Sequence, residues 1–228
     1  MLTKKKKLSK KEIKEDKLVS FYYKAYGFFD ENKTRVIIYA GALVVLIVAA
    51  VLYVNYRNQQ NQLASFELSK VMPVYDQGSY LEAIEGKAGS DVMGLKKIVA
   101  EYGSTEAGET AKIYLANSYN RLGKSDEALK YYESYDGNIS IFKAAALAGE
   151  AGYYESNKQY EKAADLYKKA AHVSENNVLN PDYLLYAGID YLNADKQEDA
   201  KQMFDSIKKN YESSPASMQV NRYLAQVD

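Results

Sequence analysis

The sequence predicts an all-α protein in which one N-terminal transmembrane helix precedes a tetratricopeptide-like α-solenoid of about four helix pairs and a C-terminal capping helix. Three observations predict this architecture. An apolar run near the N-terminus carries no charge over 19 residues, and helical units with a common pattern recur along the rest of the chain. The composition is also poor in helix breakers, since only Pro73, Pro181 and Pro215 interrupt a chain rich in Ala, Leu, Lys and Glu.

The apolar run, VIIYAGALVVLIVAAVLYV, occupies residues 36–54. At about 1.5 Å per residue it nearly matches the hydrocarbon thickness of roughly 30 Å. Helices of soluble proteins rarely stay apolar on all faces over this length. Tyr39 lies near the start of the run, and Tyr53 and Tyr56 lie at its end, where aromatic rings favour the membrane interfaces. We therefore expect a transmembrane helix over residues 36–56.

The charges on either side of this run predict its orientation. Residues 1–35 hold 11 Lys/Arg against 5 Asp/Glu, whereas only Arg57 and Lys70 are basic between the run and residue 74. The positive-inside rule then makes residues 1–35 a basic cytoplasmic segment. In a bacterium, this single-pass topology places the chain in the inner membrane with residues 57–228 as a periplasmic domain.

Two alternatives stay open in the N-terminal part. Val48-Ala49-Ala50 has the small-x-small character of a signal-peptidase site, although the long charged region and the continuing apolar run favour an uncleaved anchor. The segment LVSFYYKAYGFF, residues 18–29, places six aromatic residues just before the span. This segment is expected to be an interfacial helix, a docking site for a partner helix, or a plain aromatic anchor.

Charge and composition exclude several classes of function. Residues 36–228 hold 19 of the 30 Lys/Arg and 25 of the 30 Asp/Glu, so the body is acidic and does not suit nucleic acid. The chain has no cysteine, which excludes thiol catalysis and cysteine-ligated metal. The lone His172 lacks partners for a zinc site or a catalytic triad, and no phosphate-binding loop is present. We expect no enzymatic activity, cofactor or metal.

Three units of the body share a pattern that aligns without gaps. In each unit a small residue is followed three positions later by Tyr, twelve positions later by Ala and sixteen positions later by an aromatic residue. A small residue lets two helices approach closely, and the aromatic residues fill the space beside that contact. These positions are Ala116, Tyr119, Ala128 and Tyr132 in the first unit, Ala151, Tyr154, Ala163 and Tyr167 in the second, and Gly188, Tyr191, Ala200 and Phe204 in the third.

The three units resemble tetratricopeptide repeats, whose signature is this pattern at a period of about 34 residues. The resemblance implies a helix-turn-helix fold for each unit. In the turns, Gly123 can end its helix in a left-handed cap, and Asn157 and Asn193 can do the same less comfortably. Upstream, residues 60–80 and 94–109 look like the two helices of a degenerate first unit with residues 78–89 inserted. Downstream, Pro215 to Val227 offers one capping helix.

The whole plan of basic head, membrane helix and repeat body is similar to the membrane-anchored repeat proteins grouped with the ancillary subunit of the bacterial SecYEG translocon. That resemblance implies contact with the SecYEG translocon and with periplasmic chaperones that handle newly exported proteins. The expected function is a membrane-tethered protein-interaction scaffold that also contacts lipid through residues 36–56. The alternatives are a structural or homo-oligomeric role in an envelope assembly, or coordination of cell-wall synthesis.

Repeat geometry places the partner-binding groove on the first helix of each unit. Positions of these helices outside the shared core pattern are the candidate protein-binding residues: Thr110, Ile113, Asn117, Asn120, Arg121, Glu155, Asp182, Leu185 and Ile189.

Overall fold

The computed structural model describes the backbone of residues 10–225 and the side chains of residues 19–225. The basic run at residues 4–7 and the predicted helix end at Val227 lie outside the described residues. The chain divides into two compact units, Met1–Tyr56 and Arg57–Asp228. Over residues 10–225 the secondary structure is ten α-helices and one isolated bridge between Gly86 and Met93.

Helix α1 runs from Lys10 to Asp76 and has one non-helical residue, Asn32, where two helices meet at a kink. Among the described residues, its part Val19–Asp76 is the one helix long and apolar enough to cross a membrane, and the apolar window is not buried by protein. Beyond residue 56 the helix continues without a break to Asp76, with Pro73 inside it.

The first unit of the solenoid differs from the predicted helix pair. Helix α3, Leu95–Tyr102, ends seven residues before the predicted boundary at residue 109, because Thr105 starts a new helix by accepting a hydrogen bond from the Gly108 amide. The predicted insertion folds as helix α2, Tyr80–Glu85, and packs on α4. Its Ile84 is fully buried, so this insertion forms part of the core.

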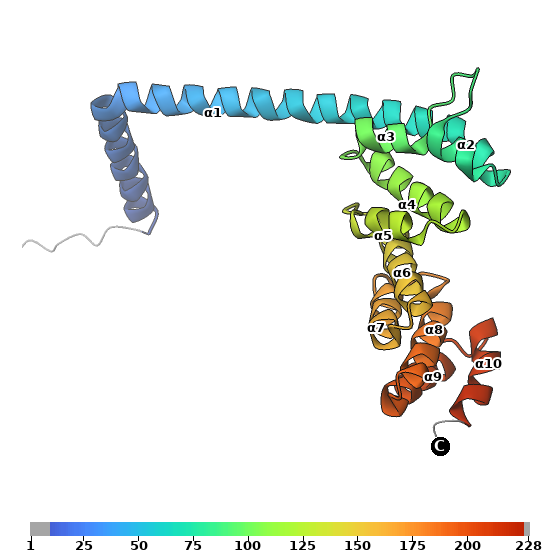
Figure 1. Cartoon of the computed structure of the whole chain (residues 1–228). Coiled ribbons are helices and arrows are strands. Elements are labelled where there is room, and N and C mark those ends of the chain that lie inside the picture. Colours follow the sequence, from blue (N-terminus) through green and yellow to red (C-terminus); the bar gives the residue numbers. More distant parts are fainter. Residues whose placement is uncertain (1–9, 226–228) are drawn as a thin grey trace, which may run out of the picture. The chain divides into compact units, whose positions relative to one another are not determined.

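The remaining helices form three antiparallel pairs and a cap, which stack in order from α4 to α10 (Figure 1). Each pair packs on the next through neighbouring helices, as in α7 against α8. This is an all-α tetratricopeptide-type solenoid. The helices are α4 (Glu106–Arg121), α5 (Ser125–Glu133), α6 (Ser140–Ser156), α7 (Tyr160–Ala171), α8 (Asn180–Asn193), α9 (Gln197–Asn210) and α10 (Pro215–Leu224).

The positions of the repeated pattern lie in the core. All small residues and alanines of the pattern are buried, and so are its aromatic residues except Tyr154, which is half-buried. The fit is tight at Gly188, where an added methyl group would overlap the Phe204 ring. Helix α10 closes the stack by burying Ala216 and Val220. Close helix contact at small residues therefore holds each pair together.

In each turn within a helix pair, one residue has a left-handed backbone conformation, and it occupies the same position of the repeat in all three pairs. Gly123 has φ +72° as predicted, but the corresponding residues are Lys158 with φ 59° and Asp195 with φ 58°. Asn157 has φ −91°, and Asn193 is still helical, so these two predicted caps were wrong. The left-handed residue follows the end of the helix, and it comes one residue later than expected in the second unit and two residues later in the third.

Replacing Lys158 by Gly is expected to stabilise the fold by about 0.5–1 kcal/mol, because a left-handed conformation strains a residue with a Cβ atom. The reciprocal change, Gly123→Ala, introduces that strain and is expected to destabilise the fold by about 1 kcal/mol. Urea unfolding of the full chain in detergent micelles measures both. Equal effects of the same sign would contradict the shared turn geometry.

Candidate protein-binding face

Half-buried aromatic rings form a continuous row across the first helices of the solenoid, here called the aromatic ladder: Tyr80, Tyr75, Tyr114 and Phe142. The ring centroids of Tyr75 lie 5.5 Å from Tyr80 and 5.1 Å from Tyr114, and Tyr114 lies 6.1 Å from Phe142. All three pairs meet edge to face, the geometry that aromatic quadrupoles favour. The ladder joins α2, α1, α4 and α6 and keeps part of each ring accessible.

A hydrogen bond next to the ladder joins α5 to α4. The Tyr132 hydroxyl of α5 donates a hydrogen bond of 2.6 Å to Asn117 Oδ1 on α4. Burial raises the pKa of Tyr132 to about 12. Burial also raises the pKa of Tyr75, although Asn117 and Arg121 counteract part of this shift. Both phenols are therefore neutral near pH 7, and the exposed Arg121 guanidinium supplies positive charge beside them.

Small residues continue this face along α6. Ala145, Ala148 and Gly152 are three and four positions apart, so they lie on one side of the helix, and all three are half-buried. Gly149, next to them, is covered by the Tyr132 ring, which an added methyl group would overlap. Small side chains therefore line this side of α6.

A carboxylate pair lies between α6 and α8. Glu155 accepts a hydrogen bond of 3.1 Å from the Tyr167 hydroxyl, and the Tyr167 ring lies 5.3 Å from the half-exposed Tyr186 ring. Asp190 is 1% exposed, and neither of its carboxylate oxygens has a hydrogen bond of ordinary geometry. Burial and, secondly, Glu155 raise the pKa of Asp190 to about 7, while Asn193 offsets part of the shift.

The predicted groove residues differ in how accessible they are. Asn120 and Arg121 are exposed, and Asp182 and Ile189 are half-buried. Thr110 is also half-buried and donates its hydroxyl hydrogen bond to the Glu106 carbonyl at 3.0 Å. Glu155, as described, is engaged by Tyr167. These residues are therefore accessible to different degrees.

Two of the predicted groove residues were assigned wrongly. Ile113 is 2% exposed and shares a core cluster with Val71 of α1 and Ile84 of α2. Leu185 is 3% exposed and lies in the core of the last repeats. Asn117 is half-buried and fixes Tyr132, so its role in the fold is structural. Ile113 is buried because the inserted helix α2 packs on the α4 surface that repeat geometry leaves open.

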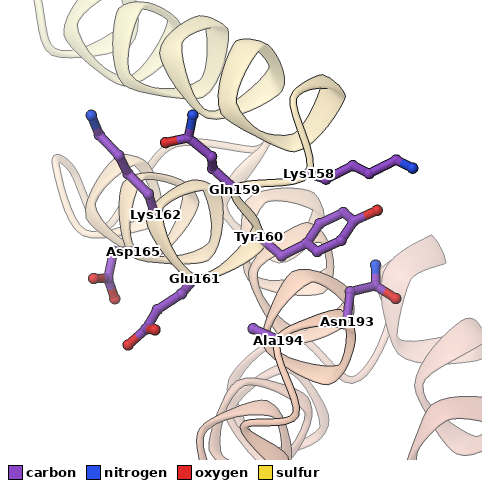
Figure 2. A pocket seen from close by; sticks show the side chains of 8 residues that line it. All are labelled: Lys158, Gln159, Tyr160, Glu161, Lys162, Asp165, Asn193 and Ala194. Atoms are coloured by element: carbon purple, nitrogen blue, oxygen red, sulfur yellow. The ribbon is translucent and has the colours of Figure 1, made fainter.

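A separate open pocket of about 560 Å³ lies where the turn before α7 meets the end of α8. Figure 2 shows the carboxylates of Glu161 and Asp165 on one side of it and Lys158, Tyr160 and Asn193 on the other.

The two carboxylates of this pocket already have partners. Glu161 forms an ion pair of 3.0 Å with Lys196, and Asp165 accepts a hydrogen bond of 2.6 Å from the Tyr191 hydroxyl. Both contacts join α7 to the following repeat. We interpret the pocket as a junction between two repeats, because its acidic groups form the contacts that hold the repeats together.

Groups with catalytic or metal-binding capacity do not converge in the described part of the chain. No set of three or more His, Cys, Asp or Glu side chains there is arranged to hold a metal ion. His172 is exposed, and its Nδ1 lies 2.7 Å from the Lys168 carbonyl of the preceding turn. The aromatic ladder is the feature that sequence reasoning missed, because Tyr75 and Tyr80 lie in the degenerate unit, where the repeat pattern gives no register.

Comparison with known families agrees with the fold. The tetratricopeptide repeat family model matches residues 110–135 and 182–214. These two matches cover α5 and most of α4, and nearly all of α8 with α9. A search of curated proteins found no significant match. The solenoid is thus of the tetratricopeptide class, a fold typically used as a protein-binding scaffold.

Proposed function

We propose that this protein is a membrane-tethered interaction scaffold of a bacterial envelope. Residues 36–56 anchor it in the inner membrane, residues 1–35 remain in the cytoplasm, and residues 57–228 bind other proteins in the periplasm. The exposed apolar part of α1 supports the anchor, and the basic excess before it supports the orientation. The repeat matches support a protein-binding role.

The aromatic ladder is the observation that carries this proposal. Tyr and Phe rings give a large contact area with few rotatable bonds, and such rings are enriched at the centres of protein interfaces. In this chain the four rings of the ladder meet edge to face. A partner therefore meets a surface that is already ordered, which lowers the entropic cost of binding.

The resemblance to membrane-anchored repeat proteins suggests the translocon and periplasmic chaperones as partners. The test is to purify the tagged full chain from mildly solubilised membranes and to identify co-purifying proteins by quantitative mass spectrometry. Recovery of translocon subunits or chaperones is the expected result. Self-association alone would favour the structural role instead, and recovery of a cell-wall synthase would favour coordination of cell-wall synthesis.

A paired substitution tests whether the ladder face is the working surface. Asn120→Ala with Arg121→Ala removes two exposed side chains at the C-terminal end of α4, where the Arg121 charge acts on Tyr75 of the ladder, and is expected to reduce partner recovery several-fold. The matched control, Lys130→Ala with Glu133→Ala, changes two exposed residues of α5 and should leave recovery unchanged. Both variants should keep the free energy of unfolding within about 0.5 kcal/mol of wild type. Equal recovery with all three proteins would exclude this face.

A further inference from the structure

The part of α1 that precedes the kink at Asn32 carries a dense group of aromatic side chains. Phe21, Tyr22, Tyr26, Phe28 and Phe29 are between 44% and 72% exposed, so the described protein does not cover them. The segment is α-helical, which fixes the direction of each side chain around the axis.

Helical geometry places these aromatic residues on one side. At about 100° per residue, Phe21, Tyr22, Tyr26, Phe28 and Phe29, together with Val19 and Ala25, fall within about half of the helix circumference. The other half holds Ser20, Tyr23, Lys24, Gly27, Asp30 and Glu31. This segment is therefore amphipathic, and only Tyr23 among its aromatic residues lies on the polar side.

The kink at Asn32 separates this segment from the apolar span. Asn32 has φ −114° and ψ 16°, and its side-chain Nδ2 donates a hydrogen bond of 3.0 Å to the Phe28 carbonyl. The chain changes direction at this residue (Figure 1). The uncharged run begins only four residues later, at Val36, so a helix that leaves the span axis here lies at the level of a membrane surface.

The chemistry of the segment fits a lipid surface. Tyr and Phe rings favour the boundary between headgroups and acyl chains, and an amphipathic helix buries its apolar side there. Lys24, Lys33 and Arg35 can extend their charged ends to lipid phosphates, and residues 1–35 as a whole carry a basic excess. A segment that docks a soluble protein would not need to lie directly next to the membrane span.

We propose that residues 19–31 form an interfacial helix whose aromatic side lies in the headgroup region of the leaflet on the N-terminal side of the anchor. This inference rests on the membrane anchor proposed above. It assigns the segment a lipid ligand and makes it a second membrane contact that fixes the depth of the span.

Tryptophan fluorescence tests the proposal, because the chain has no Trp and each substitution creates a single reporter. The full chain is reconstituted in phospholipid nanodiscs that contain lipids brominated either near the glycerol end or near the middle of the acyl chain. Tyr22→Trp and Tyr26→Trp report on the aromatic side, and Ser20→Trp is the matched control on the polar side. Leu46→Trp, inside the apolar run, reports on the anchor.

Tyr22→Trp and Tyr26→Trp are expected to be quenched roughly threefold more strongly than Ser20→Trp, and mainly by the shallow bromines. Leu46→Trp should be quenched mainly by the deep bromines. If Leu46→Trp escapes quenching, the anchor itself is wrong. If Leu46→Trp is quenched but the Tyr22 and Tyr26 reporters are no more quenched than Ser20→Trp, the anchor stands and the interfacial helix is wrong.

Discussion

Gly149→Ala is expected to destabilise the solenoid by about 2–4 kcal/mol, because the added methyl group overlaps a ring that has no room to move. That ring belongs to Tyr132 of α5, which is 4% exposed and is held by its hydrogen bond to Asn117. To accommodate the methyl group, α5 and α6 must separate or the hydrogen bond must break. Either change loses packing between the first two repeats.

Gly152→Ala in the same helix is the matched control and should have the opposite sign. A Cβ atom at Gly152 would lie 3.5 Å from the Tyr167 hydroxyl oxygen, an ordinary contact. Alanine favours a helix interior over glycine, so a gain of about 0.5–1 kcal/mol is expected. Chemical unfolding of the full chain in detergent micelles, followed by near-ultraviolet tyrosine ellipticity, measures both. Similar effects of the two substitutions would show that α5 does not pack on α6 through Tyr132.

Asp190→Asn is expected to remove a pH dependence of stability. Burial raises the folded-state pKa of Asp190 from 3.8 to about 7, so the folded state binds the proton more tightly than the unfolded state. The contribution to stability is complete below about pH 4 and decreases until about pH 7, after which it stays constant. The total loss reaches up to about 4 kcal/mol, since one pKa unit corresponds to about 1.4 kcal/mol.

The measurement is the free energy of unfolding of wild type and variant at several pH values between about 3.5 and about 8.5, a range that extends from below the unfolded pKa of 3.8 to above the folded pKa of about 7. The stability of the variant relative to wild type should increase with pH, because the amide stays neutral where the carboxyl group of Asp190 ionises. Asp205→Asn, at an exposed position of α9, controls for the loss of one surface charge. A difference between variant and wild type that is constant over the whole range would mean that the Asp190 carboxylate is solvated.

The repeat pattern was sufficient to predict the helix pairs, because each signature residue serves a contact within its own unit. Ala116 and Ala128 are buried together with Tyr119 and Tyr132, as their spacing predicted. The turns were less accurate, since the end of a helix can shift by one or two residues without disturbing that contact. Lys158 and Asp195 therefore hold the left-handed position that Asn157 and Asn193 were expected to occupy.

The candidate groove was harder to predict, because exposure depends on what packs against a helix from elsewhere in the chain. Ile113 has the spacing of a groove residue, but α2 comes from a segment outside the repeat pattern and covers it. The same packing brings Tyr75 and Tyr80 beside Tyr114 and thereby creates the aromatic ladder.

Composition and periodicity alone were enough to establish the all-α class, the apolar helix and the register of three helix pairs, because these depend on patterns within short segments. Packing in three dimensions was needed to learn that α2 closes the α4 face, that Gly149 accommodates the Tyr132 ring, and that Asp190 is buried beside Glu155. Each of these contacts joins segments from different helix pairs. The local sequence pattern does not predict such contacts, since they form only when one helix pair docks on the next.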